Sequence, residues 1–286
     1  MLSKRSLFSP LTILPAALLL AAPVQGQMAS SGLQEVVIRT RDYQFEAPAV
    51  VRSGPTHIEL INEGPDFHHV WLVRLLDGKT VEDLKAFLAG GDAALPDWAV
   101  DEGGPNTPDR PGEETSVYMD LKPGNYAMMC VIPAAVDGLP HIAHGMIQGL
   151  EVVESASPDD PAAFPKPDMT MTLDDYSFGL SKLITPGEHT IRVVNNANQA
   201  HEVVVVKLAE GKTAQDFVQW VGTVPREKGN EPGEILGGVT GISKGEFNIF
   251  TMDFEPGRYA LLCFVPDAGD GMPHFMHGMV QEFTVG

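Results

Sequence analysis

The feature that most constrains this chain is an internal repeat in strict register. A shift of 133 residues aligns the landmarks of the two halves without a gap. The matched segments are DYQF at Asp42 with DYSF at Asp175, PGNYAMMC at Pro123 with PGRYALLC at Pro256, and DGLPHIAHGM at Asp137 with DGMPHFMHGM at Asp270. Similarity at a fixed period indicates a duplicated structural unit. We therefore expect two similar domains rather than one large unit.

The first 26 residues have the pattern of a secretory signal peptide. Lys4 and Arg5 form a short basic start, and LTILPAALLLAA follows as an apolar core that is too short for a membrane span. Small residues up to Gly26 suit a signal peptidase. We therefore expect residues 1–26 to be removed and the mature protein to be periplasmic or secreted, with no membrane anchor.

The remaining sequence divides into two predicted domains and a linker. The segment SASPDDPAAFPKPD, residues 155–168, is rich in Pro, Ala and Asp and is typical of a linker. This predicts a first domain over residues 27–154 and a second over residues 169–286. Each would have a common domain size.

Within each predicted domain the pattern is mostly that of β-strands. Runs such as HIELINE and TIRVVNN are short, rich in β-branched residues and bounded by turn residues. One helix is predicted in each half, because Thr80 and Thr213 are followed three residues later by Asp83 and Asp216, as in a helix N-cap. We therefore predict an all-β fold class with two tandem Greek-key β-sandwich domains, each with a short helical insertion.

The charge of the chain restricts its partners. The formal net charge is −19, and it becomes −21 when Lys4 and Arg5 are removed with the signal peptide. Such an acidic protein lacks the positive surface that nucleic acids and anionic lipids attract. It is instead attracted to basic partners. The sequence contains no nucleophilic triad, phosphate-binding glycine loop or paired carboxylate motif.

The most specific chemistry lies in a loop that occurs twice. Cys130 and Cys263 are the only cysteines, and each begins the pattern C-x-x-P-x-x-x-D-G-x-P-H-x-x-H-G-M. Identity between the halves is concentrated here, which indicates a shared chemical task. An exported protein with two cysteines also allows the interpretation of one structural disulfide. Equivalent positions in two repeats favour separate roles instead.

Thiolate and thioether ligands favour copper, and imidazole suits copper, zinc or iron. Two imidazoles and a thiolate with a weakly bound methionine form a blue-copper site for electron transfer. In such a site one histidine comes from a distant strand, and the others follow in the order Cys, His, Met. The predicted ligands are His68, Cys130, His141 and Met146 in the first half, and His201, Cys263, His274 and Met279 in the second.

Each half resembles a cupredoxin, the copper domain of plastocyanin, pseudoazurin and copper nitrite reductase. NNANQAHEVVV is similar to the segment of the first histidine, and PGRYALLC to the strand that leads to the cysteine. HIAHGM and HFMHGM are similar to the end of the pseudoazurin loop. The loop from cysteine to histidine is longer here, as in nitrite reductase. The resemblance covers nearly all of the mature chain and implies two type 1 copper sites.

Two features depart from this family. Asn usually follows the first histidine, whereas this chain has His69 and Glu202 there. Such a change alters the orientation of the ligands and the redox potential. His144 and His277 are additional histidines two residues before the methionine. They are interpreted as surface imidazoles, with an alternative role as a ligand or a docking residue. The other methionines of the loops, Met128, Met129 and Met276, are expected to fill packing gaps.

Three functions are compatible with these observations. The favoured one is an exported carrier of single electrons that serves a redox partner, for which the net charge favours a basic protein such as a cytochrome. The second is copper handling by a chaperone or buffer. The third is a two-domain multicopper oxidase or nitrite reductase, which the sequence disfavours because Met129 and Leu262, rather than histidines, precede the cysteines. The sequence gives neither the oligomeric state nor the redox potential.

Overall fold

The computed structural model describes residues 33–90, 95–155, 163–226 and 229–286. The predicted signal peptide, residues 1–26, lies outside the described residues, as do residues 156–162 of the predicted linker. Among the described residues, no helix has the length and apolar character needed to cross a membrane.

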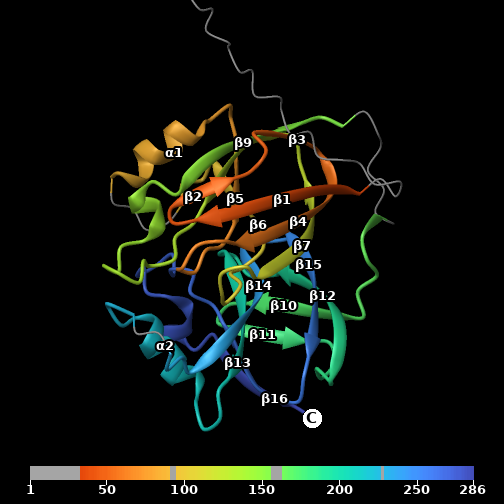
Figure 1. The fold of residues 1–286 in the computed structure, drawn as a ribbon. Helices are drawn as coiled ribbons and strands as arrows, with labels where there is room; N and C mark the ends of the chain where they lie inside the picture. The colour runs from red at the N-terminus through yellow and green to blue at the C-terminus, as the bar shows by residue number, and fades with distance from the viewer. Residues whose placement is uncertain (1–32, 91–94, 156–162, 227–228) are drawn as a thin grey trace, which may run out of the picture.

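The two halves of the chain contain matching series of elements (Figure 1). The first half contains β1 (Gln34–Arg41), β2 (Gln44–Glu46), β3 (Val50–Arg52), β4 (Gly54–Asn62), β5 (Trp71–Leu75), α1 (Val81–Leu88), β6 (Ala99–Gly103), β7 (Glu114–Leu121), β8 (Gly124–Met129), the short 3₁₀ helix η1 (His141–His144) and β9 (Ile147–Val153). The second half contains β10 (Met169–Asp174), β11 (Ser177–Leu180), β12 (Gly187–Asn195), β13 (His201–Leu208), α2 (Ala214–Val221), β14 (Gly233–Ile242), β15 (Phe247–Phe254), β16 (Gly257–Leu262), η3 (His274–His277) and β17 (Val280–Val285).

The strand order repeats with the sequence. In the first sheet, β2-β1-β4-β7 of the first half corresponds to β11-β10-β12-β15 of the second. In the facing sheet, β9-β8-β5-β6 corresponds to β17-β16-β13-β14, and only β3 has no counterpart. The first pair of each half is antiparallel, whereas β1 with β4 and β10 with β12 are parallel. The prediction of an all-β fold with one short α-helix in each half is confirmed.

The two halves are joined strand to strand. β7 pairs with β15 at Tyr118 and Ile249, and β6 pairs with β14 at Glu102 and Ile242. These contacts extend the sandwich into one sheet of eight strands and another of nine. Each half thereby covers an edge strand of the other, which would otherwise present unpaired backbone groups.

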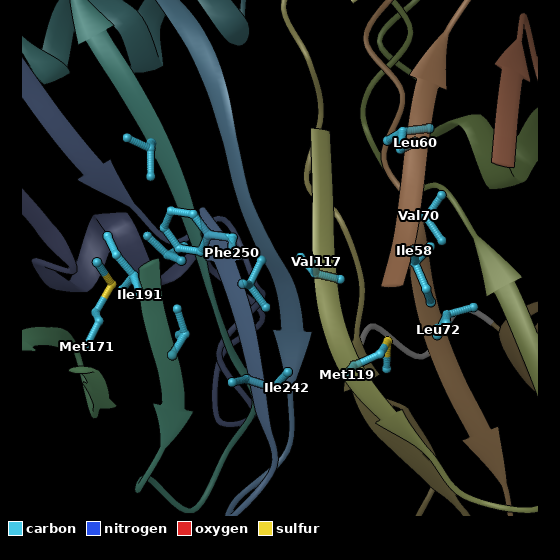
Figure 2. Packing of buried hydrophobic residues seen from close by; sticks show 14 of the residues in the cluster. Ile58, Leu60, Val70, Leu72, Val117, Met119, Met171, Ile191, Ile242 and Phe250 are labelled. Atoms are coloured by element: carbon cyan, nitrogen blue, oxygen red, sulfur yellow. The ribbon is translucent and has the colours of Figure 1, made fainter. Parts of the chain in front are cut away.

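The apolar core is also continuous across the halves. One cluster of buried side chains includes Ile58 of β4, Val117 of β7, Ile191 of β12 and Phe250 of β15. Figure 2 shows these side chains between the strands of both halves. Alternating buried and half-buried residues along β4 and β12 point one face of each strand into this core, as expected for a strand with one face covered.

The helices begin where the sequence predicts. In both, the threonine hydroxyl accepts the backbone N–H of the aspartate three residues later, and that carboxylate accepts the threonine N–H. These capping boxes satisfy donors that the first turn of a helix leaves unpaired. The structure adds the 3₁₀ turns η1 and η3, which the sequence analysis did not predict. Both contain predicted ligands.

Candidate metal centres

The first centre lies where the loop before β5 meets the loop between β8 and β9. His68 precedes β5, Cys130 directly follows β8, and His141 begins η1. All three side chains are completely buried. One potential ligand atom from each lies within 4.8 Å of the others, and Cys130 Sγ is 3.4 Å from His141 Nδ1. The structure thus brings together side chains that are far apart in the sequence.

The second centre repeats this arrangement. His201 begins β13, Cys263 directly follows β16, and His274 begins η3. All are completely buried. Cys263 Sγ lies 3.4 Å from His274 Nδ1 and 3.9 Å from His201 Nδ1. The Nδ1 atoms of both histidines therefore face the sulfur, as three ligands around one ion require.

The predicted methionine ligands are part of the same compact loops. Met146 and Met279 are completely buried. The N–H of Cys130 donates to the carbonyl of Met146, and the N–H of Met146 donates to the carbonyl of His141. The second half has the matching pair of bonds. The backbone therefore holds cysteine, histidine and methionine together before any ion binds. That the methionine sulfur is a ligand stays a prediction.

The glycine of the HGM sequence makes this loop geometry accessible. Gly145 ends η1 with φ 96°, and Gly278 ends η3 with φ 99°. This left-handed conformation costs glycine nothing, but it is unfavourable for a residue with a Cβ. It reverses the chain within one residue, so that histidine and methionine can lie in one loop.

The donor set of each centre fits a copper ion. In the first, Nδ1 of His68 is buried and has no hydrogen-bond partner among the described residues. A buried polar atom without a partner is costly, and a bound metal ion is one way to satisfy it. Two imidazoles and a thiol form the combination of intermediate and soft ligands that copper prefers.

In the absence of a metal, burial shifts the pKa of several of these side chains in the direction that favours the neutral form. It lowers the pKa of His68 to about 4, helped by the neighbouring His141 ring. Burial, together with the neighbouring His201, likewise lowers the pKa of His274 to about 4. Burial raises the pKa of the Cys130 thiol to about 12 and that of Cys263 well above its usual value. The imidazoles are therefore ready to bind, whereas each thiol must lose a proton to become a ligand.

The residues that replace the family's asparagine hold the cysteine segment directly. His69 Nε2 accepts the N–H of Val131 at 3.1 Å. Glu202 Oε1 accepts the N–H of Phe264 at 2.8 Å, and the Glu202 N–H points to Cys263 Sγ at 3.4 Å. Both side chains are buried. Although His and Glu differ chemically, each accepts the backbone N–H that follows the cysteine.

A carboxylate lies behind the second histidine in both centres, but it comes from different segments. His141 Nε2 lies 3.4 Å from Asp66, which is in the loop before His68. His274 Nε2 lies 3.8 Å from Asp267, which is in the cysteine loop. At the position that matches Asp66, the second half has Gln199, which donates to Asp267 at 3.0 Å. The acidic group has therefore changed place while the contact to histidine is kept.

Among the described residues, the first centre receives a cation from the other half and the second does not. Arg226 donates from Nη1 to Asp66 at 3.1 Å and from Nη2 to the Pro133 carbonyl at 2.8 Å. Its backbone N–H donates to the Ala135 carbonyl. Burial raises the pKa of Asp66, but bonds from His141 and the N–H groups of Ala135 and Phe67, together with the Arg226 charge, lower it below its usual range. One ion pair thus connects the second half to the first cysteine loop.

The additional histidines lie outside the two buried His–Cys–His groups, on an aromatic cover; His277 is close to Asp267 and Asp270 in a separate, more exposed group of potential ligands. Tyr43 stacks on His144 at 4.3 Å and meets His141 edge-on at 5.0 Å. Tyr176 packs in the same way against His274 and His277. The two tyrosines have φ 62° and 60°, an uncommon conformation for a residue other than glycine. The same strained backbone in both halves places an aromatic ring over each centre.

The alternative of a structural disulfide is wrong for this structure. Both cysteines are free and buried, each beside its own pair of histidines.

Sequence reasoning missed the carboxylates, the cation and the tyrosine cover. The DYQF and DYSF repeat contains a usable signal for the tyrosines, because its identity between the halves exceeds what packing needs. The signal for the carboxylates is that the two halves differ at two aligned positions. Asp66 aligns with Gln199, and Ala134 aligns with Asp267. Arg226 leaves no signal, since it has a role in only one half.

The fold and these centres define a two-sheet β-protein with a buried His–Cys–His group in each half, which fits the predicted cupredoxin-like sandwich. The chain is similar to the dithionite-reduced auracyanin from the photosynthetic bacterium Roseiflexus castenholzii, with 20% identity over 41% of this chain and 94% of that one and a TM-score of 0.30. It is similar to auracyanin B at 20% identity over 43% of this chain and 92% of that one, with a TM-score of 0.30. A multicopper oxidase matches 93% of this chain and 94% of its own at 13% identity, with a TM-score of 0.26.

No family model and no curated protein matches the chain. The TM-scores are low, so the assignment of the fold rests on the strand order and on the geometry of the two centres.

Proposed function

We propose that the protein binds one copper ion in each half, as a type 1 site, and transfers electrons one at a time. The observation that supports this most strongly is the duplicated group of completely buried histidines and cysteine. Two sequences that have diverged elsewhere retain the same donors, and Nδ1 of His141 and of His274 lies at the same 3.4 Å from the cysteine sulfur. Copper bound there would supply a one-electron redox couple.

The surrounding residues suit that role because they restrict movement. The cysteine segment is held by the methionine carbonyl on one side and by His69 or Glu202 on the other. A site that cannot rearrange when the ion changes its charge loses little energy in each electron transfer. The protein then supplies orientation and a dry environment, and no bond needs to be made or broken.

Burial of the ligands also separates this proposal from copper handling. A chaperone must exchange its ion with a partner, which requires accessible ligands. His68, Cys130 and His141 are completely buried, and Tyr43 covers His141 from outside. This arrangement favours an ion that stays bound.

We further propose that the mature protein is exported and meets a basic redox partner, in keeping with the net charge of −19 of the full chain, which becomes −21 without Lys4 and Arg5. Opposite charges on the two partners accelerate their association, and salt screens this attraction. The rate of electron transfer to a basic partner such as a cytochrome should therefore fall as the ionic strength rises. A rate independent of salt would refute the electrostatic part of the proposal.

The central test is a visible absorption and electron paramagnetic resonance spectrum after copper loading, with bound copper counted. Two copper ions per chain and an intense thiolate-to-copper charge-transfer band are expected. A third copper would support an enzyme. A colourless protein that holds zinc, copper(I) or no metal would refute electron transfer through type 1 sites.

A further inference from the structure

A large cavity lies between the two centres. Its volume is about 910 Å³, within the range of small-molecule sites in proteins. Its walls come from both halves: Leu88 of α1, Val221 of α2, and apolar residues of both cysteine loops, including Ile142 and Phe264. Such a cavity could hold a molecule of one to three rings. Neither the ligands of the two centres nor the proposed electron transfer requires it.

Four buried polar residues lie in the mostly apolar wall, His69, Asn106, Thr107 and Glu202, and the exposed Lys85 also lines the cavity. Two of them, His69 and Glu202, have hydrogen-bonding atoms that the protein uses little. His69 Nε2 accepts the N–H of Val131, so the proton of the neutral ring is on Nδ1. No described residue accepts that Nδ1–H. The nitrogen is nevertheless not fully buried, because it keeps some accessible surface. The donor therefore has access to the cavity.

Glu202 offers the complementary acceptor. Its Oε1 is used by the Phe264 N–H, whereas its Oε2 receives only the amide of Asn106 at the long distance of 3.3 Å. A carboxylate oxygen can accept further hydrogen bonds. One wall of the cavity thus offers a free N–H donor and an underused carboxylate acceptor, surrounded by apolar side chains.

We propose that this cavity binds a small, uncharged, hydroxylated aromatic molecule. Its rings would pack between the apolar walls of the two halves, one oxygen would accept the His69 Nδ1–H, and a hydroxyl group would donate to Glu202. A purely apolar ligand would leave the His69 donor without a partner, which is unfavourable in a dry site. An anionic ligand would lose its hydration with little compensation, because the one basic side chain among the described lining residues, Lys85, is exposed and already paired with Glu82.

The proposal is tested on metal-free protein, so its outcome is independent of the proposed copper function. The probe is biphenol, a two-ring compound with a hydroxyl group at each end. Binding is measured by isothermal titration calorimetry at a pH above the pKa of Glu202, which burial raises to about 7, so that this side chain is a carboxylate. Dimethoxybiphenyl is the matched control ligand, because its oxygens can accept but not donate a hydrogen bond. Loss of the bond to the carboxylate should weaken binding about tenfold. Equal affinities, or no binding of biphenol, would overturn the proposal.

Two variants locate the binding site. Ala89, which directly follows α1, and Val221, the last residue of α2, line the cavity, whereas Ala86 is an exposed residue of α1 that does not line it. Ala89→Trp and Val221→Trp should each reduce the affinity for biphenol at least about tenfold by filling the cavity. Ala86→Trp adds the same bulk to the same helix and should leave the affinity unchanged. Unchanged affinity in both cavity variants would place the ligand elsewhere and overturn the proposal.

Discussion

The ion pair between Arg226 and Asp66 is the contact by which the second half reaches the first centre, and its removal provides a sharp test. We consider the substitution Arg226→Met, which retains an apolar chain of similar length. The guanidinium loses its bonds to Asp66 and to the Pro133 carbonyl, whereas the backbone bond to Ala135 is kept. The stacking of the cation near Phe67 and Trp220 is also lost.

The expected cost follows from burial. The Arg226 side chain is 4% exposed and that of Asp66 12%. Removing one partner of such a buried pair leaves an uncompensated charge and typically costs about 3 to 5 kcal/mol of unfolding free energy. Asp66 keeps the N–H groups of Ala135 and Phe67 as donors. We therefore expect a loss near the lower limit, about 3 kcal/mol.

Urea denaturation of the metal-free protein measures this loss. The matched control is Arg258→Met, which removes the pair with Glu282 at the surface, where the side chains are 45% and 32% exposed. That exposed pair should be worth less than about 1 kcal/mol. A double-mutant cycle with Asp66→Asn separates the pair from the other contacts of Arg226.

A second measurement concerns the copper-loaded protein. Without Arg226, the negative charge of Asp66 behind His141 is no longer balanced, so the higher oxidation state is favoured. The reduction potential of the first centre should fall, whereas that of the second should stay the same. Equal destabilisation by Arg226→Met and Arg258→Met, with no change in potential, would refute the role assigned to this pair.

Three further predictions follow from the two centres. Cys130→Ser and Cys263→Ser should each remove one copper ion, measured by metal analysis, and leave the other half folded; unfolding of the whole chain would argue for a shared unit. In the metal-free protein, the folded-state pKa values of His68, His69 and His274 are about 4, 3 and 4, all below the unfolded value. The unfolded chain therefore binds more protons, and stability in urea should be fully present above about pH 6.5 and fall towards pH 4. Burial raises the pKa of Glu202 to about 7, so the folded state binds more protons here, and this group should reduce stability as the pH rises from about 4.5 to 7. Glu202→Gln should remove that part of the pH dependence, and an unchanged profile would contradict the assigned pKa.

Much of each centre could be predicted from the sequence because the repeat compares the chain with itself. The spacing from Cys130 to His141 and Met146 is local, and a strand followed by one loop can bring such residues together whatever the rest of the chain does. His68 was found because the register distinguishes it from His69. The capping pairs at Thr80 and Thr213 are local too, and both helices begin there.

The contacts around the ligands could not be predicted in this way. Asp66 and Asp267 reach the same histidine position from different segments, so neither forms a repeated motif. His69 and Glu202 differ in chemical type, but each accepts the backbone N–H of the residue that follows the cysteine. Only the folded structure reveals this similarity.

The sequence by itself determined the β-rich class, the duplicated plan and the residues that form each His–Cys–His group, because strand alternation, caps and loop spacing are local properties. The tertiary structure alone decided how the halves combine. The pairing of β6 with β14 and of β7 with β15, the reach of Arg226 to Asp66, and the cavity between the cysteine loops all join segments that are distant in the sequence. Such contacts depend on the shape and charge of two folded surfaces, and no periodicity in the chain encodes them.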